Sequence, residues 1–339
     1  METGGIYGAA AYTGKWDGMM SALGGSGAQL PEWASGLQNV MAGHRSGDIV
    51  WNGSMAKYNT FKVGGKAEAI VFPKGRDELS RLIRGVNSIG VPWVILGRGS
   101  NVVIADEGLK GVVIVLGRDF EGIEMVEDGA DSVVIRAEAG CSLAKLVSWA
   151  VERGFAGLEF AAGIPGSVGG AIVMNAGAWQ REMKDVLVRV SIMDAQGNIC
   201  TRQVDEMHFA YRTWGEMKGG IALEGFFRLK KDNPAMLKKI CREHQKRRKI
   251  LQPQNMASGG SFFKNPQGDK TAGQLIDQAG LKGRTVGGAK VSTVHANFIV
   301  NTGRATARDI IDLMRIVQKT VYEKYGIALE PEVKILGLE

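Results

Sequence analysis

Two glycine-rich segments of the sequence are candidates for binding phosphate groups. The first is Gly97-Arg98-Gly99-Ser100-Asn101, and the second spans residues 163–170 with the order Gly-Ile-Pro-Gly-Ser-Val-Gly-Gly. Because glycine lacks a Cβ atom, the backbone N–H groups of such segments can converge on a pyrophosphate. Neither segment matches a Walker A loop or a Rossmann fingerprint, which disfavours those two kinds of site. Either segment alone could be a simple turn, but the two together favour a long dinucleotide, with FAD as the expected one.

Charge and composition narrow the class of partner. A net charge of +7 over 339 residues suits anionic partners, either phosphates and carboxylates or nucleic acid. The 48 glycines are about twice the usual share, which indicates many tight turns. The three cysteines lie far apart and none of the four histidines has metal-ligand spacing, so we expect no disulfide framework and no metal site. This cysteine usage favours a reducing cytoplasm.

The elements that must position the glycine-rich segments alternate between strands and helices. Residues 67–73, 77–89 and 91–96 predict a β-α-β unit in which the helix buries one apolar face. Ser142 is expected to open a second helix, which Gly154 ends. The remaining expected elements are strands at 112–116, 133–137, 186–194, 221–229, 297–301 and 332–336, and helices at 235–250, 272–278 and 306–325.

The helix expected over residues 235–250 is strongly basic. Its cations are Lys238, Lys239, Arg242, Lys246, Arg247, Arg248 and Lys249. We interpret them as a solvated helix face. Nucleic-acid binding is not expected, because no aromatic residues alternate with the cations to stack on bases.

Five further motifs accompany the two glycine-rich segments. They are Asn59-Thr60-Phe61-Lys62-Val63-Gly64-Gly65, Asn175-Ala176-Gly177, Tyr211-Arg212, Gly260-Ser261-Phe262-Phe263-Lys264-Asn265-Pro266 and Leu329-Glu330-Pro331-Glu332-Val333. Taken in order over residues 59–337, the motifs resemble the UDP-N-acetylenolpyruvoylglucosamine reductase (MurB) family, part of the FAD-binding enzymes typified by vanillyl-alcohol oxidase. The resemblance implies an α+β fold, with a two-subdomain FAD-binding module of the PCMH type and a C-terminal α+β substrate domain.

The resemblance also implies a reaction. It is the NADPH-dependent reduction of UDP-N-acetylglucosamine enolpyruvate to UDP-N-acetylmuramate, with FAD as cofactor, in peptidoglycan synthesis. Arg212 would stabilise the enolate, since a guanidinium can hold a carboxylate through two parallel hydrogen bonds. Ser261 would donate the proton, which requires a nearby cation such as Lys264 because serine is a very weak acid.

The third residue implied by the resemblance is Glu332, which would assist the enolate or the proton transfer. Alternation along a strand would place Glu330 and Glu332 on the same face. The sequence pattern alone therefore leaves both glutamates open, and only the family pattern favours Glu332.

Binding residues follow from the same motifs. The residues expected to bind the cofactor are Gly97, Arg98, Gly99, Ser100, Asn101, Gly163, Ile164, Pro165, Gly166, Ser167, Gly169, Gly170, Asn175, Ala176 and Gly177. A diphosphate needs several cations and hydrogen-bond donors. The residues expected to contact the nucleotide sugar are Tyr211, Lys264, Asn265, Lys282 and His295.

We expect three parts along the chain. Residues 1–50 form an N-terminal extension that is partly disordered, residues 51–230 an FAD-binding module split near residue 118, and residues 231–339 the substrate-binding domain. The first 30 residues lack the pattern of a secretory signal, and no apolar segment suits a membrane helix. A cytoplasmic monomer or weak homo-oligomer is expected.

Two alternatives to this reading differ from it in kind. A flavin oxidase of the same superfamily would pass its electrons to oxygen, and a non-catalytic module would bind nucleotides or nucleic acid through its basic surface. One departure from the family pattern follows Tyr211-Arg212, where Trp214 is expected to narrow the substrate entrance.

Overall fold

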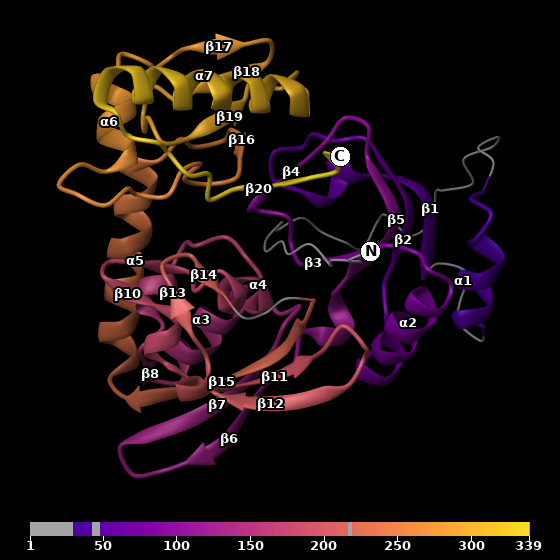
Figure 1. Cartoon of the computed structure of the whole chain (residues 1–339). Helices are drawn as coiled ribbons and strands as arrows, with labels where there is room; N and C mark the ends of the chain where they lie inside the picture. Colours follow the sequence, from indigo (N-terminus) through magenta and orange to yellow (C-terminus); the bar gives the residue numbers. More distant parts are fainter. Residues whose placement is uncertain (1–29, 43–47, 216–218, 339) are drawn as a thin grey trace.

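The computed structural model describes residues 30–42, 48–215 and 219–338 (Figure 1). Most of the extension expected over residues 1–50 lies outside these described residues. In its described part, helix α1 (Ala34–Val40) buries Leu37 in the hydrophobic cluster that contains helix α2 (Arg76–Ser88). The sequence analysis did not predict α1.

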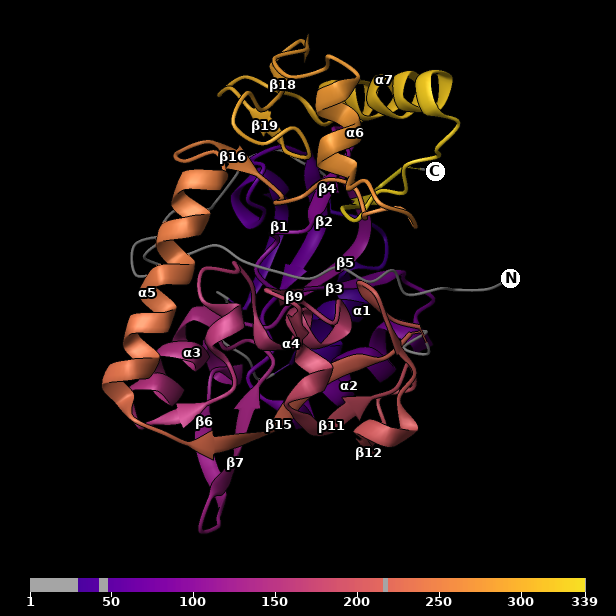
Figure 2. The same ribbon diagram turned by 90° about the vertical axis from the view of Figure 1, so that its left-hand side faces the viewer.

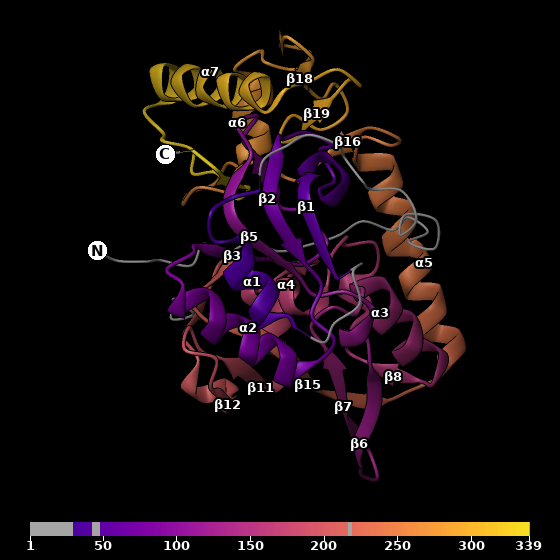
Figure 3. The ribbon, with the colours of Figure 1, turned by 90° about the vertical axis from the view of Figure 1, so that its right-hand side faces the viewer.

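A four-stranded sheet forms the first part of the described chain. Its order is β1 (Ile49–Ser54), β2 (Lys66–Val71), β5 (Leu109–Val115) and β3 (Trp93–Leu96). Strands β2 and β3 both run parallel to β5, and α2 connects them, which confirms the predicted β-α-β unit. The predicted apolar face of α2 is buried, and α2 lies against the sheet beside α1 (Figure 3).

A six-stranded antiparallel sheet follows. Along its main path the order is β12 (Ile199–Gln203), β11 (Leu187–Met193), β15 (Ile221–Lys231), β7 (Ser132–Glu138) and β6 (Ile123–Asp128), and β8 (Phe155–Ala156) pairs with the end of β15. Helix α3 (Leu143–Glu152) begins as predicted, because the Ser142 hydroxyl accepts a hydrogen bond of 3.0 Å from the Lys145 N–H. Helix α4 (Val168–Val173) packs on β15, and its first turn contains the end of the second glycine-rich segment.

The two sheets share one hydrophobic cluster. Leu79 and Leu82 of α2 lie in it together with Leu223 of β15. This joint core fixes how the first and second glycine-rich segments face each other, because each segment is attached to one of the two sheets.

The rest of the chain forms a small antiparallel sheet with two covering helices. The strand order is β16 (Ala257–Ser258), β19 (Ile299–Asn301), β18 (Ala289–Val291) and β17 (Thr285–Val286). Helix α6 (Ala272–Gln278) has the predicted bounds, and α7 (Ala307–Tyr325) starts after the N-cap Thr306. Their core includes Phe61 from the N-terminal part of the chain.

Three features join this last part to the rest of the chain. The long helix α5 (Pro234–Leu251) runs from the end of β15 to β16 along one side of the molecule (Figures 1 and 2). The C-terminal strand β20 (Lys334–Leu336) then returns and pairs in parallel with β4 (Val102–Ile104), immediately after the first glycine-rich segment. In addition, the Asp106 carboxylate accepts hydrogen bonds of 2.9 Å from the Ala307 and Arg308 N–H groups at the start of α7. The fold therefore brings residues near both ends of the chain to one place.

Candidate active site

A cavity of about 200 Å³ lies where these parts meet. Its walls come from both glycine-rich segments, from the turn at residues 211–212, from residues 259–265 and from the start of α5's connection to β16. Arg212, Ser261 and Glu332 all line it. The three residues expected to be catalytic, which lie far apart in the sequence, are thus gathered around one space.

Arg212 lies at the tip of a two-residue hairpin. Strands β13 (Phe209–Ala210) and β14 (Thr213–Trp214) pair antiparallel, so Tyr211 and Arg212 form the turn, and Arg212 has a left-handed φ of +59°. A non-glycine residue in this conformation costs about 1 kcal/mol or more. The strain is compatible with a functional role, because the conformation directs the side chain into the cavity wall.

Trp214 was expected to narrow the entrance to the site, and this expectation is wrong. Its side chain is buried in the core of the second sheet, against Phe209, with ring centroids 5.5 Å apart. The reason is the hairpin geometry, which turns Arg212 toward the cavity and Trp214 toward the core.

Glu332 forms an ion pair with the arginine. Its Oε1 lies 3.2 Å from Arg212 Nε, and the Glu332 backbone N–H donates to the Phe262 carbonyl at 2.8 Å. Burial raises the pKa of the Glu332 carboxyl above its ordinary value, although the charges of Arg212 and Lys264 oppose this shift. Glu332 is therefore a carboxyl that can hold a proton at a higher pH than usual.

The expectation that Glu330 and Glu332 share one face is wrong. Strand β20 begins only at Lys334, and the glutamates flank Pro331 in an isolated bridge to Phe263. The Glu330 side chain is 67% exposed and pairs with Lys264 Nζ at 2.5 Å, whereas that of Glu332 is 19% exposed. The structure thus separates two glutamates that strand periodicity would have placed together.

Ser261 lines the cavity and is half-buried. Gly260 precedes it with a φ of +82°, and the next residue, Phe262, is held by a hydrogen bond of 2.7 Å from its N–H to the Asn297 carbonyl. Because the Phe262 carbonyl also accepts a hydrogen bond from the Glu332 N–H, the backbone segments that carry Ser261 and Glu332 are held next to each other.

The two glycine-rich segments offer unpaired N–H groups beside the cavity. Among the residues that the structure describes, the backbone N–H groups of residues 97–101 and of residues 166–167 donate no hydrogen bond to the protein. Ser100, Asn101, Pro165 and Gly166 line the cavity. Such convergent free donors fit a pyrophosphate, since buried N–H groups otherwise find partners.

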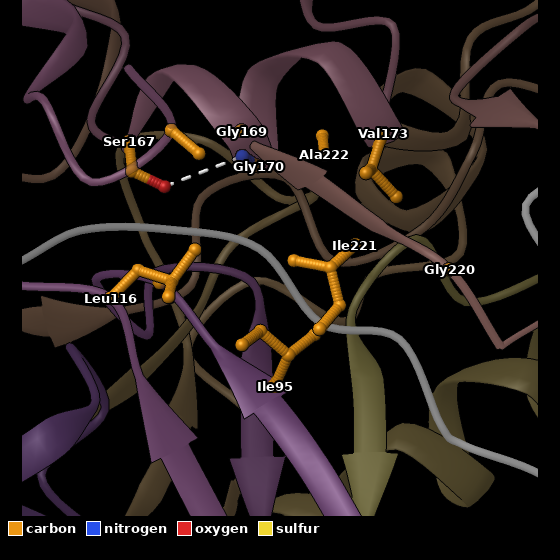
Figure 4. A pocket seen from close by; sticks show the side chains of 11 residues that line it. Ile95, Leu116, Ser167, Gly169, Gly170, Val173, Gly220, Ile221 and Ala222 are labelled. Carbon is orange, nitrogen blue, oxygen red and sulfur yellow. Dashed lines mark hydrogen bonds between the residues drawn. The ribbon is translucent and has the colours of Figure 1, made fainter. Parts of the chain in front are cut away.

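A second, smaller cavity of about 40 Å³ lies between the same segments (Figure 4). Ile95 and Leu116 line it from the first sheet, Ile221 from β15, and Val173 from α4. Gly170 lines both cavities. A dinucleotide such as FAD could therefore place its pyrophosphate at the free N–H groups and the face of an aromatic ring against the apolar lining of the small cavity.

The remaining residues expected to bind the cofactor divide into two groups. Those that line at least one of the cavities are Gly97, Ile164, Ser167, Gly169, Gly170, Ala176 and Gly177. Those that line neither are Arg98, Gly99, Gly163 and Asn175. At Gly99 the backbone packs closely, since a Cβ atom there would lie 1.9 Å from the Tyr58 carbonyl oxygen. The cofactor contacts of all these residues stay predictions.

The residues expected to contact the sugar are also divided. Tyr211 and Asn265 line the large cavity, and Lys264 lies close enough to affect Glu332. Lys282 and His295 line neither described cavity: Lys282 Nζ pairs with Asp277 at 2.6 Å, and burial lowers the pKa of His295. The roles of all five residues stay predictions.

Arg248 and Gln252 are cavity residues that the sequence analysis missed. The basic helix was interpreted as a solvated face, but α5 turns one stripe inward: Leu237 and Cys241 are buried, and His244 and Arg248, which follow at helical spacing, are half-buried. Burial lowers the pKa of the Arg248 guanidinium, and within the described parts of the chain no carboxylate pairs with it. The helical spacing of this stripe was the sequence signal that could have revealed Arg248. The structure places its partly desolvated cation at the cavity.

Two family models match the chain. Residues 67–202 match an FAD binding domain, and residues 252–336 match the C-terminal domain of UDP-N-acetylenolpyruvoylglucosamine reductase. The first match spans both glycine-rich segments, which agrees with the free N–H groups found there. The residue types around the cavities therefore fit FAD as the cofactor.

Curated relatives match over most of the chain. The UDP-N-acetylenolpyruvoylglucosamine reductase of Caldanaerobacter subterraneus is 42% identical over 86% of this chain and 95% of its own length. That of Clostridioides difficile is 41% identical over 86% and 94%. A crystal structure of the reductase (MurB) from Thermus caldophilus aligns with a TM-score of 0.70 and 35% identity, covering 85% of this chain and 98% of that one. The chain belongs to the UDP-N-acetylenolpyruvoylglucosamine reductase family.

Proposed function

We propose that this protein uses NADPH and bound FAD to reduce UDP-N-acetylglucosamine enolpyruvate to UDP-N-acetylmuramate. The observation that carries the proposal is the gathering of Arg212, Ser261 and Glu332 around one cavity, beside loops with free N–H donors. FAD, when bound, supplies hydride transfer from NADPH to the terminal carbon of the enolpyruvyl double bond.

The residues of this chain would manage the charge that the reduction creates. Addition of hydride to the terminal carbon leaves an enolate on the carboxylate side. Arg212 can bind this enolate, because it has N–H groups in addition to those that contact Glu332 and Gly177. Because the site is partly buried, each such hydrogen bond is stronger than it would be in water. Arg212 therefore acts as the electrostatic stabiliser.

The adjacent carbon must then receive a proton. We assign this step to the Ser261 hydroxyl, because Ser261 lines the cavity next to the backbone that is hydrogen-bonded to Glu332. Lys264 is engaged by Glu330 but contributes positive charge near the site, as its effect on Glu332 indicates. Glu332, with its raised pKa, is the group suited to hold or return a proton there.

Binding of the substrate's anionic groups falls to the cations and amides of the walls. Arg248, with no described carboxylate partner, is the strongest candidate for a phosphate or carboxylate contact. Gln252, Tyr211 and Asn265 supply hydrogen bonds around it. Lys282 and His295 line neither described cavity, so they would contact a part of the sugar nucleotide that extends beyond it.

We propose further that the protein acts in the cytoplasm as a monomer or weak homo-oligomer, with the domain limits given above. Its three cysteines are free, as a reducing compartment requires. Among the described residues, no helix is long and apolar enough to cross a bilayer.

The two half-reactions of the flavin test this function. Under anaerobic conditions, NADPH should bleach the flavin absorbance, and the enolpyruvyl sugar should restore it. In Ser261→Ala, bleaching should continue at nearly the normal rate, while restoration by the sugar should slow by about 100-fold or more. Equal loss of both half-reactions would contradict the role of Ser261. Restoration only by air would replace the proposed function with that of an oxidase.

Ser258→Ala is the matched control. Ser258 lies three residues earlier on β16, outside the described cavities, and its described contacts are made by its backbone, which pairs with Val300 and accepts a hydrogen bond from Thr60. Both half-reactions should proceed as in the unaltered protein.

A further inference from the structure

The hairpin formed by β9 (Gly177–Ala178) and β10 (Arg181–Glu182) contacts the Arg212 guanidinium at two points. The Gly177 carbonyl accepts a hydrogen bond of 3.1 Å from Arg212 Nη2, and Glu182 Oε1 lies 3.9 Å from Arg212 Nη1. Gly177 and Glu182 are opposite each other in the hairpin. Arg212 is therefore held from the hairpin on one side and from Glu332 on the other.

Glu182 is itself fixed by a buried asparagine. Its Oε2 accepts a hydrogen bond of 2.8 Å from Asn175 Nδ2, and Asn175 is fully buried. The same Asn175 amide donates to the Ala210 carbonyl at 3.3 Å, one residue before the Tyr211-Arg212 turn. Glu182, Asn175, Ala210 and Arg212 thus close a ring of contacts, in which moving one member disturbs the others.

The turn of this hairpin packs against α5. Trp179 and Gln180 form its turn with φ values of +55° and +62°, although glycine and asparagine are the usual residues in such turns. The Trp179 ring stacks on His244, with centroids 4.8 Å apart and planes 13° from parallel. Packing against the helix compensates the strain, so the hairpin is a rigid support.

From these contacts we infer that Glu182 is a positioning residue for Arg212 in the reduction of the enolpyruvyl sugar, an inference that rests on the proposed function. Arg212 occupies a strained turn and faces two carboxylates. With Glu332 alone, the guanidinium would be drawn toward that single partner. The second carboxylate, held by Asn175, balances this attraction and keeps the remaining N–H groups directed to the substrate carboxylate.

Glu182→Gln tests the inference, because it removes the charge and keeps the size of the side chain. Reduction of the flavin by NADPH should stay within about twofold of normal, since Arg212 has no part in it. Restoration by saturating enolpyruvyl sugar should slow by about tenfold, because misplacing a catalytic group acts on kcat. A change confined to KM, or an equal slowing of both half-reactions, would overturn the inference.

Lys184→Gln is the matched control. Lys184 Nζ lies 3.2 Å from Glu182 Oε2, so this variant removes an ion pair of Glu182 without touching its contact with Arg212. Both half-reactions should remain within about twofold of normal, since an ion pair with an exposed lysine contributes little. A tenfold loss in this control would show that charge near Glu182, and not the position of Arg212, is responsible.

A double-mutant cycle separates positioning from a general structural effect. In an Arg212→Lys background, Glu182→Gln should slow restoration by less than about twofold, because the fork that Glu182 orients is gone. The same tenfold loss in both backgrounds would overturn the inference. If Glu182→Gln does not fold, Glu182→Asp carries the same test, since it keeps the charge but withdraws it from Arg212.

The outcome for the unaltered protein distinguishes the two levels of the argument. Failure of the sugar to restore its flavin absorbance would refute the proposed function. Normal restoration that Glu182→Gln leaves unchanged would refute only the role of Glu182.

Discussion

The two glycine-rich segments have similar compositions but use their glycines differently. In residues 97–101 none of the backbone N–H groups has a protein partner among the described residues, and Gly99 passes so close to Tyr58 that no Cβ atom fits. In residues 163–170, by contrast, Val168 and Gly169 donate to the Cys141 and Ala139 carbonyls at 2.8 and 3.0 Å. The first segment therefore presents donors, whereas the end of the second fastens the start of α4 to the turn that follows β7.

A glycine pattern therefore indicates that another group packs closely against the backbone, but it does not tell whether that group is a ligand or another part of the protein. In the first segment the free N–H groups are available to a ligand. In the second, part of the same freedom is used for packing, since a Cβ atom on Gly169 would lie 2.7 Å from Ala139 Cβ. Substitutions that add one methyl group should therefore have graded effects.

The largest effect is expected for Gly99→Ala. The new Cβ atom would lie 1.9 Å from a backbone oxygen, and φ is +66°, so the loop must move. We expect FAD affinity to fall at least about 100-fold and stability by more than about 2 kcal/mol. Titration of the apoprotein with FAD and thermal melting measure the two quantities.

Gly90→Ala is the control for Gly99→Ala. Gly90 has nearly the same φ, +67°, but no atom lies within 4 Å of the added Cβ position. Only the conformational strain remains, about 1 kcal/mol, and FAD affinity should be unchanged. Similar FAD affinities in the two variants would mean that close approach at Gly99 is unimportant.

A smaller effect is expected for Gly169→Ala, whose φ is ordinary. The added methyl would push α4 away from Ala139, lowering stability by about 1–3 kcal/mol, as overpacking does. FAD affinity should fall less than in Gly99→Ala. Adding Ala139→Gly should restore part of the melting temperature, and no restoration would show that the contact with Ala139 is not the cause.

Gly163→Ala should affect Arg248 more than FAD. Its added Cβ atom would lie 3.0 Å from Arg248 Cδ, a flexible side chain that can shift. We expect a higher KM for the sugar by a few fold, with stability lowered by about 1 kcal/mol because φ is +80°. Gly280→Ala is the control: Gly280 has a φ of +79° and no atom lies within 4 Å of the added Cβ position. This variant should lower stability without changing KM. Unchanged KM in Gly163→Ala would argue against Arg248 as a substrate contact.

The smallest effect is expected for His244→Phe, in the α5 residue that stacks on Trp179. Burial, followed by the charge of Arg247, lowers the pKa of His244 from its ordinary value of 6.5. The unfolded chain then binds more protons than the folded one as pH falls below about 6.5, so stability decreases toward acid. The phenylalanine keeps the stack on Trp179 and removes this loss. Its melting temperature should exceed that of the normal protein at pH 5.5 but not at pH 8, and a difference independent of pH would contradict this.

Local sequence signals predicted most of the secondary structure. The N-caps Ser142 and Thr306 and the bounds of α6 are local features, set by hydrogen bonds within a few residues. The predictions failed where the deciding contact was distant. Trp214 and Arg212 are two residues apart, yet only the packing of the hairpin decides which of them faces the cavity.

The sequence by itself predicted most of the longer strands and helices and the glycine motifs, and through the order of the motifs the family, because these depend on nearby residues and on residue type. Only the tertiary structure decided that Glu332 is buried against Arg212 while Glu330 is exposed, and that Arg248 leaves the basic face of α5 to line the cavity. Burial and pairing are set by chains of contacts between residues far apart in sequence, and no local period encodes them.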